Sequence, residues 1–215
     1  MQRRIVMHKL NRRDFCLGTV AGAAAIGARG RLLAGDNARF RLQYIVGSCM
    51  YGKADIERIL PELRKTGAEH LDVWPLVHGN QREQIEKMGL DKFANLLKKH
   101  RVKLGMFSHF DLGPFALRDE IAVLQRLGGS MMTCGARGPS KLSGAELKAA
   151  VLKFAEQMKP YIAAAEEAGI VIGIENHANS LIETPESLRW FGEAVTSNSI
   201  GIALAPYHLA QDALL

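Results

Sequence analysis

Residues suited to acid-base or metal chemistry follow two apolar runs near the C-terminus of this 215-residue chain. The first run, Ile170–Ile174, is followed by a carboxylate, an amide and an imidazole, which belong to Glu175, Asn176 and His177. The second run, Ile200–Leu204, is followed by Ala205-Pro206-Tyr207-His208. Carboxylates and imidazoles can bind divalent cations or carry protons, so both run ends are candidate parts of one catalytic site.

Glu175 is the strongest candidate, because it directly follows an apolar run and its carboxylate would be partly desolvated. Such a carboxylate is tolerated if it binds a cation, for which Mn, Mg, Co and Zn all suit the ligand types present. It can also act as a base that removes a proton next to a carbonyl group, while the metal holds the enediolate charge. The alternative is a structural hydrogen-bond acceptor at the end of a strand.

Further candidates lie at other predicted strand ends. His177 and His208 are each interpreted as a metal ligand, a substrate hydrogen-bonder or an ordinary loop side chain. His109 is a candidate for substrate binding, although a core or rim histidine with satisfied hydrogen bonds is the commoner case. The remaining predicted substrate contacts are the amide of Asn176 and the aromatic walls Trp74 and Tyr207.

From Phe40 onward, apolar strand-like runs alternate with segments of helical periodicity. The predicted strands are Leu42–Ser48, His70–Trp74, Val102–Phe107, Ser130–Cys134, Ile170–Ile174 and Ile200–Leu204. The predicted helices are Ala54–Lys65, Gln81–His100, Asp119–Leu127, Ser143–Ala168 and one that begins at Thr184-Pro185. Ser143 and Glu146 have the spacing of a capping box, Thr184 and Pro185 suit a helix start, and Gly169 suits a helix end.

This alternation predicts an α/β fold with a parallel sheet and right-handed crossovers. An open doubly wound sheet and an incomplete (β/α)8 barrel both fit. The first predicted strand is not followed by a glycine-rich phosphate loop, which makes a nucleotide-binding open sheet the weaker alternative. In a barrel, all the candidate residues would lie on the carboxyl-terminal rim, where barrel active sites lie.

The charge distribution argues against nucleic acid as a partner. The chain has a net charge of +6, but residues 1–41 alone carry a net +7 and the remainder a net −1. Because the body is nearly neutral, its charge gives no reason to expect binding to a polyanion. The sequence leaves the oligomeric state open, with a homo-oligomer as one alternative.

The basic N-terminus resembles a bacterial twin-arginine export signal. Arg12 and Arg13 are followed by Phe15 and then by the weakly apolar, glycine-rich and alanine-rich stretch Leu17–Ala28. We therefore expect a signal peptide and linker over residues 1–38, a domain over residues 39–215, and a periplasmic or secreted location. The alternative is a mobile basic tail. The apolar stretch is too short for a stable membrane span.

Two cysteines would remain after removal of such a leader. Cys49 and Cys134 both lie in apolar, strand-like contexts, where small buried thiols are common. We expect buried free cysteines, although a disulfide is possible in an oxidising compartment.

Three segments resemble the sugar phosphate isomerase/epimerase family of xylose isomerase-like TIM barrels: HLDVW at 70–74, IGIENHAN at 172–179 and IALAPYHL at 202–209. The resemblance implies that Glu175 binds a divalent metal and acts as acid and base. The family's sixth strand usually ends Asp-x-x-His, where the aspartate binds metal and the histidine contacts substrate. Here Ala205 replaces the aspartate and His208 matches the histidine. The family's other two ligands would lie beyond Leu215, so we expect a TIM-barrel-like domain truncated after its sixth strand.

These observations favour a sugar or sugar phosphate isomerase/epimerase-like protein that moves a proton with metal assistance on a sugar or polyol. Glu175 and His208 would be catalytic, and Glu175 would bind the metal. Because Ala205 replaces a ligand, a non-catalytic or degenerate carbohydrate-binding protein on the same scaffold is the alternative. A metal-dependent nuclease on this barrel would need a dense cluster of His, Asp and Glu, which this sequence does not supply.

Overall fold

The computed structural model of this chain describes residues 43–211. The predicted leader and linker over residues 1–38 lie outside the described residues. The boundary predicted between residues 38 and 39 lies outside them too, and both remain predictions.

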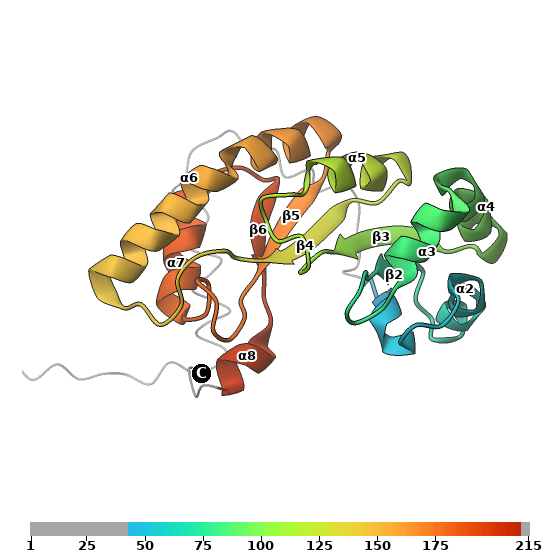
Figure 1. The fold of residues 1–215 in the computed structure, drawn as a ribbon, viewed down its shortest axis with the longest axis horizontal. Helices are drawn as coiled ribbons and strands as arrows, with labels where there is room; N and C mark the ends of the chain where they lie inside the picture. Colours follow the sequence, from blue (N-terminus) through green and yellow to red (C-terminus); the bar gives the residue numbers. More distant parts are fainter. Residues whose placement is uncertain (1–42, 212–215) are drawn as a thin grey trace, which may run out of the picture. The chain divides into compact units, whose positions relative to one another are not determined.

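Six parallel strands form one sheet in sequence order (Figure 1). The strands are β1 (Ile45–Gly47), β2 (His70–Val73), β3 (Lys103–Ser108), β4 (Met131–Gly135), β5 (Val171–Glu175) and β6 (Ile200–Ala203). Each strand pairs in parallel with the next one along the chain. This order is the one expected for successive strands of a (β/α)8 barrel, and it confirms the predicted fold class.

Helices connect successive strands, as a parallel sheet requires, and one more helix follows the last described strand. They are η2 (Ser48–Tyr51), α2 (Ile56–Lys65), α3 (Gln81–Met88), α4 (Leu90–His100), α5 (Arg118–Arg126), α6 (Gly144–Ala168), α7 (Pro185–Ala194) and α8 (Pro206–Gln211). In Figure 1, α2, α3 and α4 gather beside β2 and β3, while α6 and α7 lie near β5 and β6.

The core lies between the sheet and these helices. Leu71 and Val73 of β2, Phe107 of β3 and Ile172 and Ile174 of β5 are fully buried there. Because side chains alternate along a strand, the intervening residues face the other side of the sheet. Those intervening positions include Asp72, Ser108, Thr133, Gly173 and Glu175. The polar residues of the strands therefore share the face away from the helices.

The structure corrects the predicted helices in two places. The single helix predicted over Gln81–His100 is two helices, because Gly89 has a φ of 88° that an α-helix cannot contain. The second correction is α8, which begins at Pro206 and places Tyr207 and His208 on a helix. The sequence had suggested only a polar end to the preceding strand.

Of the three predicted helix caps, one prediction is wrong and two are confirmed. Ser143 is the N-cap of α6, but its side chain makes no capping hydrogen bond, so the capping box predicted with Glu146 is wrong. Thr184 caps α7 as expected: its side chain accepts a hydrogen bond from the Ser187 backbone N–H, and the Ser187 hydroxyl returns the contact. Gly169 ends α6 in the left-handed conformation that was predicted there.

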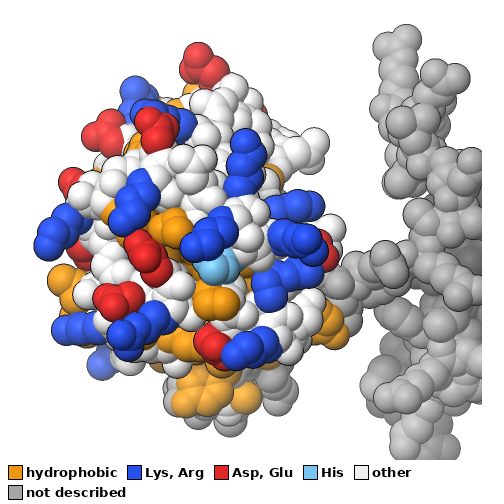
Figure 2. All heavy atoms as spheres, turned by 90° about the vertical axis from the view of Figure 1, so that its right-hand side faces the viewer, with side chains coloured by type: hydrophobic (Ala, Val, Ile, Leu, Met, Phe, Trp, Pro, Cys, Tyr) orange, Lys and Arg blue, Asp and Glu red, His pale blue; other side chains and the backbone are white. Residues whose placement is uncertain are grey.

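The helical surface carries charges of both signs. Figure 2 shows the side that α2, α3 and α4 occupy in Figure 1, where basic and acidic side chains are interspersed with apolar ones. Ion pairs link neighbouring helices: Lys92 of α4 pairs with Glu57 of α2, and Arg126 of α5 pairs with Asp91 of α4. None of the helices described within residues 43–211 is long and apolar enough to cross a membrane. Cys49 and Cys134 are both free thiols as expected, but only Cys134 is buried, whereas Cys49 is partly exposed.

Candidate functional site

The predicted site residues lie at the carboxyl-terminal edge of the sheet. Because all the described strands are parallel, their carboxyl ends meet at one edge. Glu175 is the last residue of β5 and lies in register between Gly135 of β4 and Ala203 of β6. Both flanking residues have little or no side chain, and the ring of Phe110 lies next to Gly135.

Glu175 is half-buried, and this controls its chemistry. Desolvation raises the pKa of its carboxyl group, while the neighbouring imidazoles of His177 and His208 act in the opposite direction. A carboxylate with a raised pKa is a stronger base than one in water, which suits proton abstraction at neutral pH. The structure therefore brings together Glu175, His177 and His208, three of the predicted site residues.

The two imidazoles contact each other directly. The ring centroids of His177 and His208 are 3.9 Å apart, with 39° between the ring planes. The Nδ1 atom of His177 lies 2.9 Å from the carbonyl oxygen of Ala178. The Nδ1 atom of His208 is buried and has no hydrogen-bond partner within the described residues. Tyr207 is largely exposed, and its ring meets that of His208 edge-on at 5.4 Å. An unpaired buried nitrogen is costly, so it marks a position where a ligand could bind.

Asn176 joins the ends of β5 and β6. Its side chain is fully buried, donates to the carbonyl of Ala205 at 3.0 Å and accepts from the Ala205 N–H at 2.7 Å. In this arrangement the amide holds two strand ends together. The predicted contact between Asn176 and a substrate is untested and remains a prediction. The residue in register with Glu175 is Ala203, while Ala205, matched to the family aspartate, lies beyond the end of β6.

His109 belongs to a separate, buried ion-pair network. Its ring is 3% exposed, and its Nε2 and Nδ1 atoms lie 2.9 Å from Glu120 and 3.2 Å from Asp111. Arg82 donates two hydrogen bonds to Glu120, at 2.7 and 2.8 Å. Burial opposes the charge of Glu120, but the bonds from His109 and Arg82 outweigh it and lower its pKa to about 2. The structure does not place His109 with Glu175, and its predicted substrate contact remains untested.

Trp74 lies beside a buried carboxylate that we did not predict as a site residue. The indole Nε1 of Trp74 donates to Asp72 at 2.5 Å, and the Ser108 hydroxyl donates to the same carboxylate at 3.0 Å. Burial raises the pKa of Asp72 to about 7, although both hydrogen bonds and the nearby His109 lower it. The sequence did contain a signal for this residue, because Asp72 is a carboxylate inside the apolar strand HLDVW. The sequence did not show on which face of the sheet Asp72 lies.

A cavity of about 240 Å³ opens beside Trp74, and we call it the rim cavity. It lies at the ends of β2 and β3 and is lined by Trp74, Pro75, Leu76, Val77, His78, Ser108, Phe110 and Asp111. The rings of Trp74 and Phe110 stack with centroids 5.5 Å apart, and His78 meets the indole edge-on at 5.6 Å. Aromatic walls with a few polar groups are typical of small-molecule sites.

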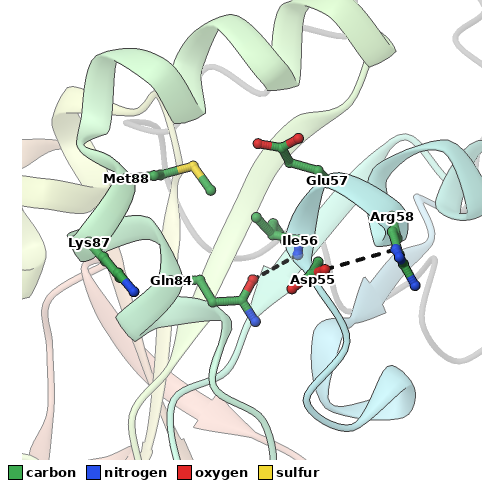
Figure 3. Close-up of a pocket in the computed structure, with 7 residues that line it drawn as sticks. All are labelled: Asp55, Ile56, Glu57, Arg58, Gln84, Lys87 and Met88. Carbon is green, nitrogen blue, oxygen red and sulfur yellow. Dashed lines mark hydrogen bonds and ion pairs between the residues drawn. The ribbon is translucent and has the colours of Figure 1, made fainter.

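A larger cavity of about 540 Å³ lies between the start of α2 and α3 (Figure 3). Its lining consists of Asp55, Ile56, Glu57, Arg58, Gln84, Lys87 and Met88. Gln84 accepts a hydrogen bond from the Ile56 N–H, and Asp55 pairs with Arg58. None of the predicted site residues lines this cavity, so its size alone does not make it the candidate site.

The residues at the candidate site do not form a complete cation site. Within residues 43–211, no three His, Cys, Asp or Glu side chains converge well enough to hold a metal ion. Glu175 and the two histidines are ligand types that Zn and Mn accept, and the unpaired Nδ1 of His208 leaves one donor free. Residues Gly135 and Ala203, on either side of Glu175, supply no ligand. The described donor set therefore does not fit a resident metal, and we assign no chemical step to one.

Solved structures share this fold. The IOLI protein with a bound zinc atom matches with a TM-score of 0.62 and 14% identity, covering 78% of this chain and 64% of its own. The probable 3-DHS dehydratase AsbF from Bacillus anthracis matches with 0.63 and 15%, covering 80% and 66%. An L-ribulose 3-epimerase matches with 0.62 and 16%, covering 80% and 63%. At these identities the likeness shows the fold alone. The chain spans slightly less than two thirds of each of these three proteins.

The sequence itself also matches a known family. A comparison with curated proteins finds no match. Residues 60–213, most of the chain, match the family described as "Xylose isomerase-like TIM barrel". The matched segment includes β2 to β6 and every predicted site residue. The chain therefore belongs to the xylose isomerase-like TIM barrel family.

Proposed function

We propose that this protein is a sugar isomerase/epimerase-like enzyme that moves a proton on a sugar or polyol. The observation that carries the proposal is the half-buried carboxylate of Glu175 beside the contacting imidazoles of His177 and His208. Membership of the xylose isomerase-like family and the fold shared with an L-ribulose 3-epimerase support a sugar as substrate.

Glu175 is the proposed acid-base group. Its carboxylate takes the proton from a carbon next to the carbonyl of a ketose, and the electron pair of that C–H bond forms an enediolate. Protonation of the same carbon on the opposite face gives the epimer. Protonation of the former carbonyl carbon, with transfer of the hydroxyl proton to the other oxygen, gives the isomer. Neither outcome changes the oxidation state of the sugar overall. His177 and His208 orient the sugar hydroxyls, and an imidazole N–H that faces the enediolate oxygen stabilises its charge.

The involvement of a divalent cation stays part of the proposal as a prediction. Glu175 is the proposed ligand, as the family resemblance implies, and Mn, Mg, Co and Zn are the candidate ions. The described residues supply too few converging ligands for such a site. The reaction is therefore assayed both with added Mn²⁺ and with a chelator.

The test is hydrogen exchange into a ketose. Purified protein is incubated with L-ribulose in D₂O, and deuterium at the carbon atoms next to the carbonyl is followed by NMR. We expect incorporation with the wild-type protein and a loss of at least about 100-fold in Glu175→Gln, since the amide cannot accept the proton. Glu193→Gln is the matched control, because Glu193 lies exposed on α7. Equal exchange in wild type and Glu175→Gln would refute the proposed role.

A non-catalytic carbohydrate-binding protein is the second candidate. It is favoured by the shortage of converging metal-ligating side chains within residues 43–211 and by Ala203 beside Glu175. Calorimetric titration with L-ribulose separates the two functions. Binding that is unchanged by a chelator and is accompanied by no deuterium exchange supports this candidate over the enzyme.

We also propose that the chain is exported by the twin-arginine route and acts in the periplasm or outside the cell. The proposal rests on the sequence of residues 1–38 alone.

A further inference from the structure

We propose that Asp72 is a positioning residue that holds the indole of Trp74 in place as a wall of the rim cavity. This inference rests on the proposed function in one respect: the wall is taken to contact the ring of the sugar. Its structural part, the dependence of Trp74 on Asp72, is tested without any sugar.

The first argument is the geometry of the contact. Asp72 is buried on the face of the sheet away from the core, where both of its carboxylate oxygens are used. The indole Nε1 of Trp74 donates to Oδ2 at 2.5 Å, and the Ser108 hydroxyl donates to Oδ1 at 3.0 Å and to Oδ2 at 3.1 Å. The Asp72 carboxylate therefore holds the Nε1 end of the indole, while the indole ring lines the rim cavity.

The second argument is that the surroundings leave room for this contact and for little else. Gly47 of β1 lies in register with Asp72. A Cβ atom at this glycine would lie 3.2 Å from the Cys49 sulfur, 3.4 Å from Trp74 Nε1 and 3.7 Å from Asp72 Oδ2. The backbone of Trp74 is fixed as well, because its N–H donates to the Ser48 hydroxyl at 2.9 Å. Backbone and indole are thus anchored separately, and only the indole depends on Asp72.

The third argument concerns charge. The groups that face Asp72 are Trp74 just after β2, Ser108 at the end of β3, His109 just after it, and the Cys49 thiol on η2. Burial raises the pKa of Asp72 to about 7. Hydrogen bonds to an ionised acceptor are shorter and stronger than those to a neutral one. The indole is therefore held more firmly above neutral pH, when Asp72 is ionised, than below it.

Trp74 can be observed by itself, because the chain contains only one other tryptophan, Trp190. In a Trp190→Phe background, acrylamide quenching of fluorescence measures how accessible the Trp74 ring is. We expect the quenching constant to fall by about twofold as the pH rises through 7. Asp72→Ala should raise it several-fold at every pH. Asp72→Asn should restore low quenching and abolish the pH step, since an amide oxygen accepts from the indole but does not titrate.

His78 is the control for a competing explanation, because its ring also contacts the indole of Trp74. We expect His78→Gln to keep the pH step. Loss of the step in His78→Gln together with its persistence in Asp72→Asn would overturn the proposal, as would equal quenching in wild type and Asp72→Ala. If Asp72→Ala fails to fold, Ser108→Ala keeps the carboxyl group. Removing the Ser108 hydroxyl donor should move the midpoint of the pH step in quenching to higher pH by roughly half a unit or more. An unmoved midpoint would also overturn the proposal.

A final arm separates this inference from the proposed function. D-fructose, as a probe ketose, should protect Trp74 from acrylamide in the Trp190→Phe protein and protect it less in Asp72→Ala. Dependence of quenching on Asp72 without any protection by the sugar supports the positioning role and overturns the sugar contact.

Discussion

The imidazole rings of His177 and His208 pack against each other with their centroids 3.9 Å apart and 39° between their planes, although one residue follows β5 and the other lies in the first turn of α8. The backbone around them is tied by Asn176, whose amide makes two hydrogen bonds to the backbone of Ala205. The position of His208 beside Glu175 therefore depends on the tie that Asn176 makes between the two strand ends.

Removing this tie should cost stability and disturb the site. We expect Asn176→Ala to lower the free energy of unfolding by about 2–3 kcal/mol, because it leaves the Ala205 N–H and C=O without their partner. Asn176→Asp should be no less costly, since its carboxylate can accept from the Ala205 N–H but faces the Ala205 carbonyl with a buried, unpaired oxygen. Urea unfolding measures both changes. An Asn176→Ala protein as stable as wild type would show that the tie is unimportant.

Glu120 should make the stability dependent on pH in the acid range. Its folded pKa is lowered to about 2 by His109 and Arg82, against the opposing effect of burial. A lowered folded pKa means that the stabilisation is fully present above the ordinary value of 4.5 and is lost as the pH falls from there toward 2. The shift corresponds to about 3 kcal/mol at neutral pH.

The matching variant is Glu120→Gln, which leaves Arg82 and His109 without their carboxylate. We expect it to unfold about 3 kcal/mol more easily at pH 7 and to differ much less from wild type near pH 3. Urea unfolding at the two pH values measures this difference. A stability gap that is the same at both values would contradict the assignment.

The cap of α7 provides a prediction with its own control. Thr184 and Ser187 make a reciprocal capping box, whereas Ser143, the N-cap of α6, makes no side-chain capping bond. Thr184→Ala should therefore lower the free energy of unfolding by about 1 kcal/mol, while Ser143→Ala should have almost no effect. Thermal unfolding of the two variants distinguishes them. Equal losses would show that the presence of the side-chain bond does not decide the cost.

The proposed export signal is tested in cells. Replacing Arg12 and Arg13 with lysine should leave the protein in the cytoplasm, because the paired arginines are the feature on which the predicted leader rests. Fractionation and immunoblotting of a bacterial host follow the location. The matched control replaces Arg3 and Arg4, which lie outside the Arg12-Arg13 pair, and should still allow export. Unchanged export of the Arg12, Arg13 variant would refute the twin-arginine route.

Much of the fold follows from local sequence pattern. All six predicted strands are present with ends shifted by a few residues, because runs such as Ile170–Ile174 are apolar at every position and suit a sheet buried on both sides. The helix break at Gly89 was missed, since one glycine inside a helical pattern does not by itself determine a positive φ. The capping box predicted at Ser143 was wrong because spacing permits that contact without enforcing it.

The candidate site was also predicted only in part. The sequence by itself determined that Glu175 and His177 come at the end of an apolar strand, and parallel pairing then requires them to lie at the common carboxyl edge. Only the tertiary structure decided which candidates meet there. Long-range contacts placed His208 against His177, while His109 is enclosed by Glu120 and Asp111. Asp72 contacts Trp74 on the face of the sheet away from the helices. Alternation along the strand shows that Asp72 and its neighbours lie on opposite faces, but only the packing of the helices decides which face they cover.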